Sequence, residues 1–600
     1  MFEYAFKKLF TAFAIVILLL VPNPLTSECS SGSSSVPPVY GGAGVGGPTS
    51  TADFWWTVNR DEILYGDKSF DIASHKDLIQ QKNPEDIVKD KYDKKNRDSK
   101  LDDSKHVAKI VKQIKDLSLL LIYNGDFSVV IRKMAKAKLL CYSNAEFKLF
   151  FDVIVEEKKS KKAEDKNHRL GALVAVGVRK MVNSKDYLKE IVSNSRDKEE
   201  IAYASESLLE VASQEAIVLI KEKLKQKTID HYLRSYLTLC LSEHLDDELT
   251  TMLKNQMNDR SVENGGRRTA MISLVMNKRL DGYEILQKVI NGKLDVFMRY
   301  DAVRLLPFVA NKKQAEEMLV ELLSDETPEI RREAAFAIAQ LNNPSYKEVL
   351  YKHLKKEKNA EALSGMSFAY SIYGGPSDES DWKGFMKKLY YKNVYSPLTY
   401  FSAVGLSISN IPKEKAMKLY VDTYKDNRQY ESRKGLILAM GLLNTQDSAD
   451  KLADILNDRR SSDLRQYAAY AIAYMKREST IIPLAEACQE GDNLVRHAAV
   501  AAHGMYGPEI LKYKPQNKKD PATRLPELKK ISEKDRVDVV RLGAAFSYDI
   551  LSGDYDTLQT VVELSKLNAN NFPLRRVDSG LLLDKVNEFY PKYHKTFLGY

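Results

Sequence analysis

Several features are scarce in this sequence of 600 residues. It has only four cysteines, with no C-x-x-C pair, which excludes a disulfide framework. Outside residues 9–21, no stretch is apolar enough over a sufficient length to span a bilayer. The sequence also has no strong excess of positive or negative charge, because it contains 91 basic and 82 acidic residues. A net charge of +9 on this length argues against a dedicated nucleic-acid binder.

The motifs that usually carry catalysis are absent as well. There is no G-x-x-x-x-G-K-[ST] phosphate loop, no G-x-S-x-G elbow and no H-E-x-x-H zinc helix. The nine histidines form no cluster with the spacing of zinc ligands. The sequence therefore predicts no catalytic residue, no metal and no cofactor, and we expect a protein that is not an enzyme.

The N-terminus is typical of an export signal. Lys7 and Lys8 precede the apolar stretch at residues 9–21, which is short for a membrane anchor and fits a secretory signal. Cys29 follows, and then a segment rich in Ser, Gly and Pro up to residue 50 that suits a tether. This arrangement resembles a bacterial lipoprotein precursor, in which the cysteine is lipidated. Thr26 and Glu28 depart from that family's pattern, so a plain secretory signal and an uncleaved anchor remain alternatives.

A helical stripe marks the clearest unit of the rest of the chain. Thr327 and Pro328 are typical of a helix start. The apolar positions that follow have the spacing i, i+4, i+7, i+8 and i+11 of one helix face. They are Ile330, Ala334, Ala337, Ile338 and Leu341. We call the residue directly after the first member of such a stripe, here Arg331, the slot.

The slot recurs along the chain in a regular register. It falls at 13 positions from 132 to 541, most of them 31 to 37 residues apart, and ten of them are arginine. These are Arg132, Arg169, Arg234, Arg267, Arg299, Arg331, Arg433, Arg465, Arg496 and Arg541, whereas Ile201, Leu363 and Thr399 hold the other three. Each interval has room for a second helix, so the sequence predicts stacked helical hairpins. An arginine in the first helical turn opposes the dipole of its own helix, and its role must lie elsewhere.

The register resembles the HEAT family, in particular the short HEAT-like repeats also found in phycobiliprotein lyases. An acidic residue, a Val-Arg pair and an Ala-Ala pair stand in this order at residues 492–499 and 538–545. The resemblance covers roughly residues 105–600. It implies an all-α, right-handed superhelix of about 12–13 hairpins, with second helices on the concave side and slot arginines that pair with acidic groups of neighbouring turns. Some HEAT-repeat enzymes are di-iron hydroxylases with paired His-Glu dipeptides, and this sequence has no such dipeptide.

The domain organisation follows from these patterns. We expect a signal peptide at residues 1–28, a tether at 29–50, a cap with a charged segment at 51–104, repeats at 105–507, an insertion at 508–535, and the last repeat with a C-terminal cap at 536–600.

One stretch combines basic and aromatic residues in the segments between slots. Its members are Tyr346, Tyr351, Lys352, Lys356, Trp382, Lys387, Lys388 and Tyr391. Such side chains suit an acidic peptide, an anionic glycan or a lipid headgroup, while a solvated face with packed tyrosines is the simpler alternative. The sequence favours a protein-binding scaffold or adaptor of the cell envelope, tethered to a membrane through Cys29. A nucleic-acid binder, which the export signal disfavours, and a lyase-like accessory protein that handles a cofactor are the alternatives.

Lipidation at Cys29 is directly testable. We expect the protein to take up labelled palmitate in a bacterial host and to be processed in a globomycin-sensitive manner, because the acyl chain is transferred to the cysteine before cleavage. The Cys29→Ser variant should lose both properties. Equal processing of the variant and an unlabelled wild-type protein would leave a plain secretory signal.

Overall fold

The computed structural model describes residues 104–563 with gaps. The gaps lie at 124–127, 141, 157–162, 278–281, 293–295, 342, 376–402, 405, 408–410, 427–429, 490, 506–526, 553–558 and 561–562. The predicted signal peptide and tether, with Cys29, lie outside the described residues, as does nearly all of the predicted cap. Within the described ranges every regular element is a helix, which confirms the all-α class. None of the described helices is long and apolar enough to cross a membrane.

The described residues fall into two compact units, which we treat separately. The first unit, up to residue 277, holds α6 (Ser104–Leu121), α7 (Ser128–Leu140), α8 (Asn144–Glu156), α9 (Ala163–Val178), α10 (Lys185–Asn194), α11 (Lys198–Lys225), α12 (His231–Cys240), α13 (Asp247–Asn258) and α14 (Asn264–Met276). A kink at Ala212, where the backbone leaves the helical region, divides α11 in two.

The second unit, from residue 282 to 563, continues the same alternation of helices. It holds α15 (Gly282–Asn291), α16 (Val296–Leu305), α17 (Lys312–Leu322), α18 (Pro328–Gln340), α19 (Lys347–Lys356), α20 (Ala360–Ile372), α23 (Lys413–Asp426), α24 (Tyr430–Leu443), α25 (Gln446–Asn457), α26 (Ser462–Met475), α27 (Ile481–Ala487), α28 (Asn493–Met505), α29 (Glu527–Lys534) and α30 (Asp538–Ser552). Helix α29 occupies residues that the sequence assigns to the insertion, and it packs on α30 as the first helix of the last hairpin.

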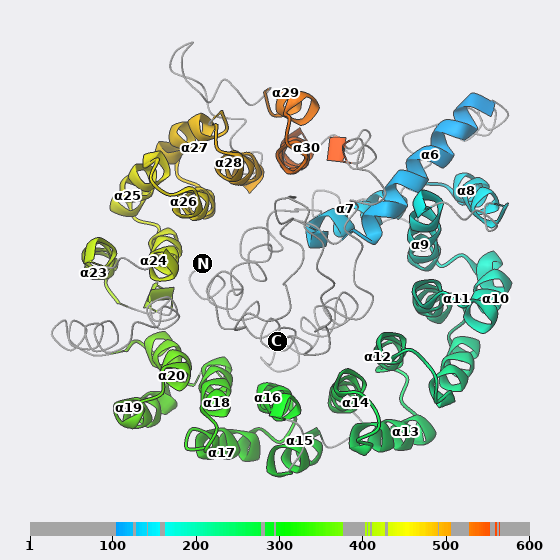
Figure 1. Cartoon of the computed structure of the whole chain (residues 1–600), viewed down its shortest axis with the longest axis horizontal. Helices are drawn as coiled ribbons and strands as arrows, with labels where there is room; N and C mark the ends of the chain where they lie inside the picture. The colour runs from blue at the N-terminus through cyan, green and yellow to red at the C-terminus, as the bar shows by residue number, and fades with distance from the viewer. Residues whose placement is uncertain are drawn as a thin grey trace, which may run out of the picture. The chain divides into compact units, whose positions relative to one another are not determined.

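Slot helices form one layer of each unit, and the helices between them form the other (Figure 1). In the second unit α16 packs on α18 and α18 on α20, whereas α15, α17 and α19 each pack mainly on the slot helix that follows. Closer packing within the slot layer makes it the inner layer of the hairpin stack. The expectation that the helices between slots line the concave side is therefore wrong for α19, which lies in the outer layer (Figure 1).

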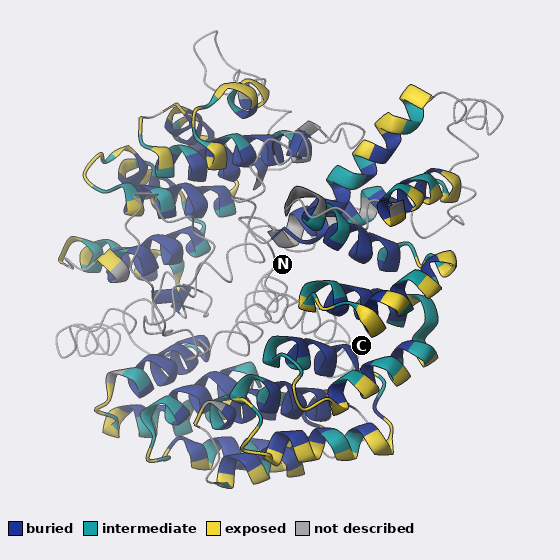
Figure 2. Cartoon of the chain, turned by 45° about the vertical axis from the view of Figure 1, so that its right-hand side comes forward, coloured by how far each residue is buried: buried dark blue, intermediate teal, exposed yellow. Residues whose placement is uncertain are grey.

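The register predicted from the stripes is confirmed by the helix boundaries. Ten slots, from Ile201 to Arg541, are each the fourth residue of their helix. Arg132 is the fifth residue of α7, Arg169 is the seventh of α9, and Thr399 lies outside the described residues. The stripe that starts beside the slot faces the core where it is described, as the buried Ile330, Ala334 and Ile338 show. Figure 2 shows the buried residues gathered where the two layers face each other.

Small residues allow the slot helices to approach closely. A Cβ atom added to Gly441 would lie 2.9 Å from the Cβ of Ala471, so only glycine fits there. Ser207 and Ser547 each donate a hydrogen bond of 2.6 Å from Oγ to a carbonyl of the preceding slot helix. These contacts need backbones near each other, and the alanine-rich stripes provide that distance without loss of helix propensity.

Several slot arginines close the C-terminal end of the preceding outer helix. Arg267 Nε donates to Met257 O at 3.1 Å, Arg299 Nε to Ile290 O at 3.0 Å and Arg465 Nε to Leu456 O at 2.6 Å. The last four carbonyls of a helix have no partner within it, and a cation there also interacts favourably with the helix dipole. The slot arginine thus opposes the dipole of its own helix but complements that of its neighbour.

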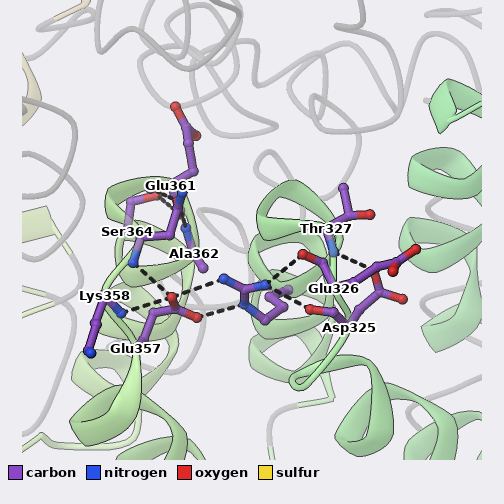
Figure 3. A network of polar contacts seen from close by, with 10 residues as sticks. Asp325, Glu326, Thr327, Glu357, Lys358, Glu361, Ala362 and Ser364 are labelled. Atoms are coloured by element: carbon purple, nitrogen blue, oxygen red, sulfur yellow. Dashed lines mark hydrogen bonds and ion pairs between the residues drawn. The ribbon is translucent and has the colours of Figure 1, made fainter.

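Several slot arginines also bind a carboxylate at the next joint, as the family resemblance implies. Arg331 donates both to the Asp325–Glu326 turn and to Glu357, which Figure 3 shows on opposite sides of the contact network. Its Nε and Nη2 donate to the two carboxylate oxygens of Glu357 at 2.7 and 3.0 Å, and its Nη1 donates to Asp325 O at 2.7 Å. Corresponding pairs join Arg299 to Asp325, Arg496 to Asp535 and Arg541 to Glu563. One side chain therefore ties together three consecutive segments of the stack.

We expect the Arg331→Ala variant to lower the free energy of unfolding by about 3 kcal/mol, because it leaves the mostly buried Glu357 carboxylate without its cation. The side chains of Arg331 and Glu357 are 16% and 8% exposed. Urea unfolding followed by circular dichroism would measure this loss. The matched control is Arg460→Ala, which removes an arginine that is 88% exposed in its pair with Asp458 and should leave the transition unchanged. Equal effects of the two variants would contradict the closing role of the slot.

Candidate interaction surface

The sequence-predicted partner-binding residues divide into two groups. Tyr346 ends a short 3-10 turn (Pro344–Tyr346), and Tyr351, Lys352 and Lys356 lie on α19. The others, Trp382, Lys387, Lys388 and Tyr391, lie outside the described residues. The geometry below concerns α19 and its surroundings only.

Local sequence explains why α19 forms and which face it exposes. The Asn343 side chain accepts a hydrogen bond from the Ser345 amide and starts the turn that leads into the helix. Leu350 and Leu354, four residues apart, are buried on one face. The lysines of the last turns occupy the opposite face and are exposed.

The two tyrosines of this region belong to the packing between repeats. Tyr346 donates from its hydroxyl to a carboxylate oxygen of Glu316 on α17 at 2.6 Å. Burial and this carboxylate raise the pKa of Tyr346 above its usual value. Tyr351 stacks on Tyr370 of α20, with ring centroids 5.2 Å apart and planes inclined by 16°. The alternative of packed tyrosines therefore describes these two residues.

Exposed ammonium groups gather at the C-terminal end of α19. We call Lys352, Lys355, Lys356 and Lys358 the basic end. Among the described residues, no carboxylate forms an ion pair with any of the four. Lys355 Nζ instead lies 4.2 Å from the ring centroid of Tyr351, as a cation–π contact. Glu357, which lies between them in sequence, is bound by Arg331 and by the amides of Lys358 and Asn359, so it does not neutralise them.

The positive charges of the basic end contribute to a lowered pKa of His353. Burial lowers its pKa below the usual 6.5, and the neighbouring charges of Lys352 and Lys356 lower it further. His353 is therefore neutral at pH 7 and adds no charge of its own.

The end of α19 also differs from the ends of α15 and α25 in its capping, because slot arginines donate to carbonyls of those two helices. Leu363 holds the slot that follows, so no slot arginine reaches the terminal carbonyls of α19. The Glu357 amide donates to His353 O at 3.0 Å. The carbonyls of Leu354, Lys355 and Lys356 accept no hydrogen bond from the described residues. Ile201 holds the other described slot without arginine. There Lys223 Nζ donates to Ser193 O, at the end of α10, at 3.0 Å.

A second charged constellation, which sequence reasoning missed, is buried in the slot layer. Glu333 of α18 is 1% exposed and binds Arg304 of α16 at 2.8 Å and Arg332 at 2.7 Å. Arg332 also binds Glu361 of α20, and Arg304 lies 3.3 Å from Asp301. The sequence signal was the carboxylate two positions after the slot, Asp301 and Glu333, a position at which no other slot is followed by a charged residue. Because its members pair with one another, we assign this network to the joints α16–α18–α20.

The remaining described side chains offer no metal site. Within the described ranges, no three His, Cys, Asp or Glu residues lie close enough together to hold a metal ion.

Comparison with known proteins places repeats of one family in the second unit. Residues 284–366 and 449–549 match the model of HEAT repeats, and these stretches contain six of the slots. The fold is thus a solenoid of HEAT-type helical hairpins. No curated protein matches the sequence.

Solved structures with some similarity include two importin-type proteins and one enzyme. Yeast importin-beta (Kap95p) has a TM-score of 0.39 and 9% identity, over 89% of this chain and 74% of that chain. The karyopherin Kap121p bound to the SUMO protease Ulp1p has a TM-score of 0.31 and 12% identity, over 82% and 57%, so this chain spans little more than half of it. Human deoxyhypusine hydroxylase has a TM-score of 0.21 and 16% identity, over 43% and 96%. TM-scores this low indicate nothing about what the present chain binds or catalyses.

The buried Glu333 predicts a pH dependence of stability. Burial would raise its pKa, but the charges of Arg304 and Arg332 outweigh burial and hold the pKa below the usual 4.5. A lowered pKa in the folded state stabilises the protein above pH 4.5, and this contribution is lost as the pH falls through the folded-state pKa. We therefore expect Glu333→Gln to destabilise the protein by about 3 kcal/mol at pH 7 and by progressively less in more acidic buffer.

Urea unfolding of both proteins between pH 7 and pH 3 measures this difference. Glu317→Gln, at a carboxylate whose side chain is 64% exposed, is the control and should behave as the wild type throughout. A Glu333→Gln penalty that stays constant across this range would show that charge plays no part in it.

Proposed function

We propose that this protein is a non-enzymatic scaffold of the cell envelope that binds another protein. The observation that carries the proposal is the basic end of α19, where four exposed lysines have no carboxylate partner among the described residues. Positive side chains in the neighbouring joints are paired within the fold. Arg299, Arg331 and Arg332 each bind a carboxylate of the neighbouring repeat or turn. Charges that the fold leaves uncompensated are available to a partner.

The regular stack supports a binding role in a second way. Several slot arginines fix the end of one outer helix against the next hairpin, which orders the outer helices of a unit relative to each other. A surface that is ordered before binding loses less conformational entropy on association. A repeat solenoid also presents an extended surface at low cost, because each hairpin contacts only its neighbours.

The envelope location rests on the N-terminal sequence. The apolar stretch at residues 9–21 and Cys29 support export and a lipid anchor, with residues 30–50 as the tether. A single acyl chain gives only marginal membrane binding, and the two or more chains of a mature lipoprotein would hold the solenoid at the surface.

Site-specific photo-crosslinking tests the binding role. A photo-reactive amino acid in place of Lys352 should give a discrete protein adduct in intact cells, which mass spectrometry then identifies. The same substitution at Lys418, an exposed lysine of α23 in the outer layer, is the control and should give none. Adducts with nucleic acid alone, or equal protein adducts at both positions, would overturn the proposal.

A further inference from the structure

The end of α19 presents two kinds of unused binding group at one place. The basic end supplies four ammonium groups, which are hydrogen-bond donors with positive charge. The last turn supplies the carbonyls of Leu354, Lys355 and Lys356, which accept nothing from the described residues. Both sets lie at the same helix terminus, because the lysines are in or directly after the turn to which the carbonyls belong.

The open carbonyls follow from the residue in the next slot. At Arg299 and Arg465 the guanidinium donates to a carbonyl in the last turn of the outer helix before it. Leu363 is 7% exposed and has no donor to offer. The acceptor groups at the end of α19 are therefore left to solvent or to a ligand.

We propose that the basic end of α19 binds an extended acidic segment of the partner protein. Its carboxylates would pair with Lys352, Lys356 and Lys358, and its backbone N–H groups would donate to the open carbonyls. This inference rests on the proposed function and specifies the chemistry of the partner.

A peptide satisfies both sets of groups, whereas simple anions satisfy only one. The phosphodiester of a lipid headgroup offers oxygen acceptors to the lysines, but it has no hydrogen atom of its own to donate to the neighbouring carbonyls. An extended peptide alternates N–H and C=O groups and carries its carboxylates on short stems. Main-chain hydrogen bonds with charged side-chain contacts are a recurring mode of peptide recognition.

The surroundings of the basic end reduce the cost of binding. Lys355 already lies over the Tyr351 ring, which is itself stacked on Tyr370. The backbone of Lys358 is fixed by its hydrogen bond to Glu357, and Glu357 in turn is held by Arg331. Side chains and backbone that are ordered in advance lose less entropy when the ligand arrives.

Fluorescence anisotropy of the purified full-length protein tests the proposal. The probe is a labelled ten-residue peptide of Asp, Glu and Gly, compared with its Asn, Gln and Gly isostere. We expect the acidic peptide to bind about tenfold more tightly than the isostere, with an affinity that falls as salt is added. The Lys352→Glu/Lys356→Glu variant should lose about tenfold in affinity for the acidic peptide.

Two controls separate this site from general electrostatics. The Lys418→Glu/Lys425→Glu variant carries the same change of charge on exposed lysines of α23 and should bind as the wild type does. An acidic peptide with methylated backbone nitrogens keeps the carboxylates but loses the donors, and it should bind more weakly to the wild type. Equal binding of the methylated peptide would overturn the assignment of the carbonyls.

The remaining outcomes distinguish this inference from the proposed function. The inference fails if the acidic peptide does not bind, if both double variants bind it equally, or if vesicles of anionic phospholipid bind with the same lysine dependence while the peptide does not. The proposed function stands in these cases if crosslinking still captures a protein at Lys352. If no protein is captured there, the proposed function fails.

Discussion

The structure depends on how the C-terminal ends of the outer helices are satisfied. The last carbonyls of a helix have no partner within it, and where the next hairpin buries such a carbonyl without a partner the cost is about 1–3 kcal/mol. An arginine at the fourth position of the slot helix meets this requirement, since its planar fork reaches two or three acceptors at once. Arg331 makes a related set of contacts, with the turn carbonyl Asp325 O on one side and the Glu357 carboxylate on the other. Slot arginines therefore link their own helix to the preceding helix or turn and, in several repeats, to a carboxylate of the next joint.

Within the slot layer, close approach determines what else is possible. Backbones near enough for Ser207 and Ser547 to reach carbonyls of the preceding helix leave room only for small side chains between them. Where large charged residues do occur in this layer, as at Arg304, Arg332 and Glu333, they are buried and must pair with one another. Replacement of such a network by apolar residues is often neutral for stability, so its presence is better understood as fixing one register between α16, α18 and α20 than as a source of free energy.

At the end of α19, by contrast, the four lysines of the basic end form no ion pair with a described carboxylate. Leu363 holds the slot from which an arginine closes the ends of α15 and α25. Arg331 binds Glu357, so this carboxylate does not pair with the lysines around it. The position of α19 in the outer layer further separates these lysines from the buried slot layer (Figure 1). Tyr346 and Tyr351, which the sequence groups with the lysines, instead hold α19 to α17 and α20. A binding surface and a packing surface are therefore adjacent on one short helix.

The sequence by itself determined the class of fold and the register of the repeats. Apolar stripes with helical spacing and a recurrent arginine are local signals, because the rotation of a helix follows from the residues within it. For the same reason the helix start at Thr327 could be placed from the chain alone. The acceptors of the slot arginines, the buried network of Glu333, the outer position of α19 and the helix α29 inside the expected insertion were decided only by the tertiary structure. Each of these depends on contacts between residues about 10 to 40 positions apart, whose geometry is set by how one hairpin packs on the next.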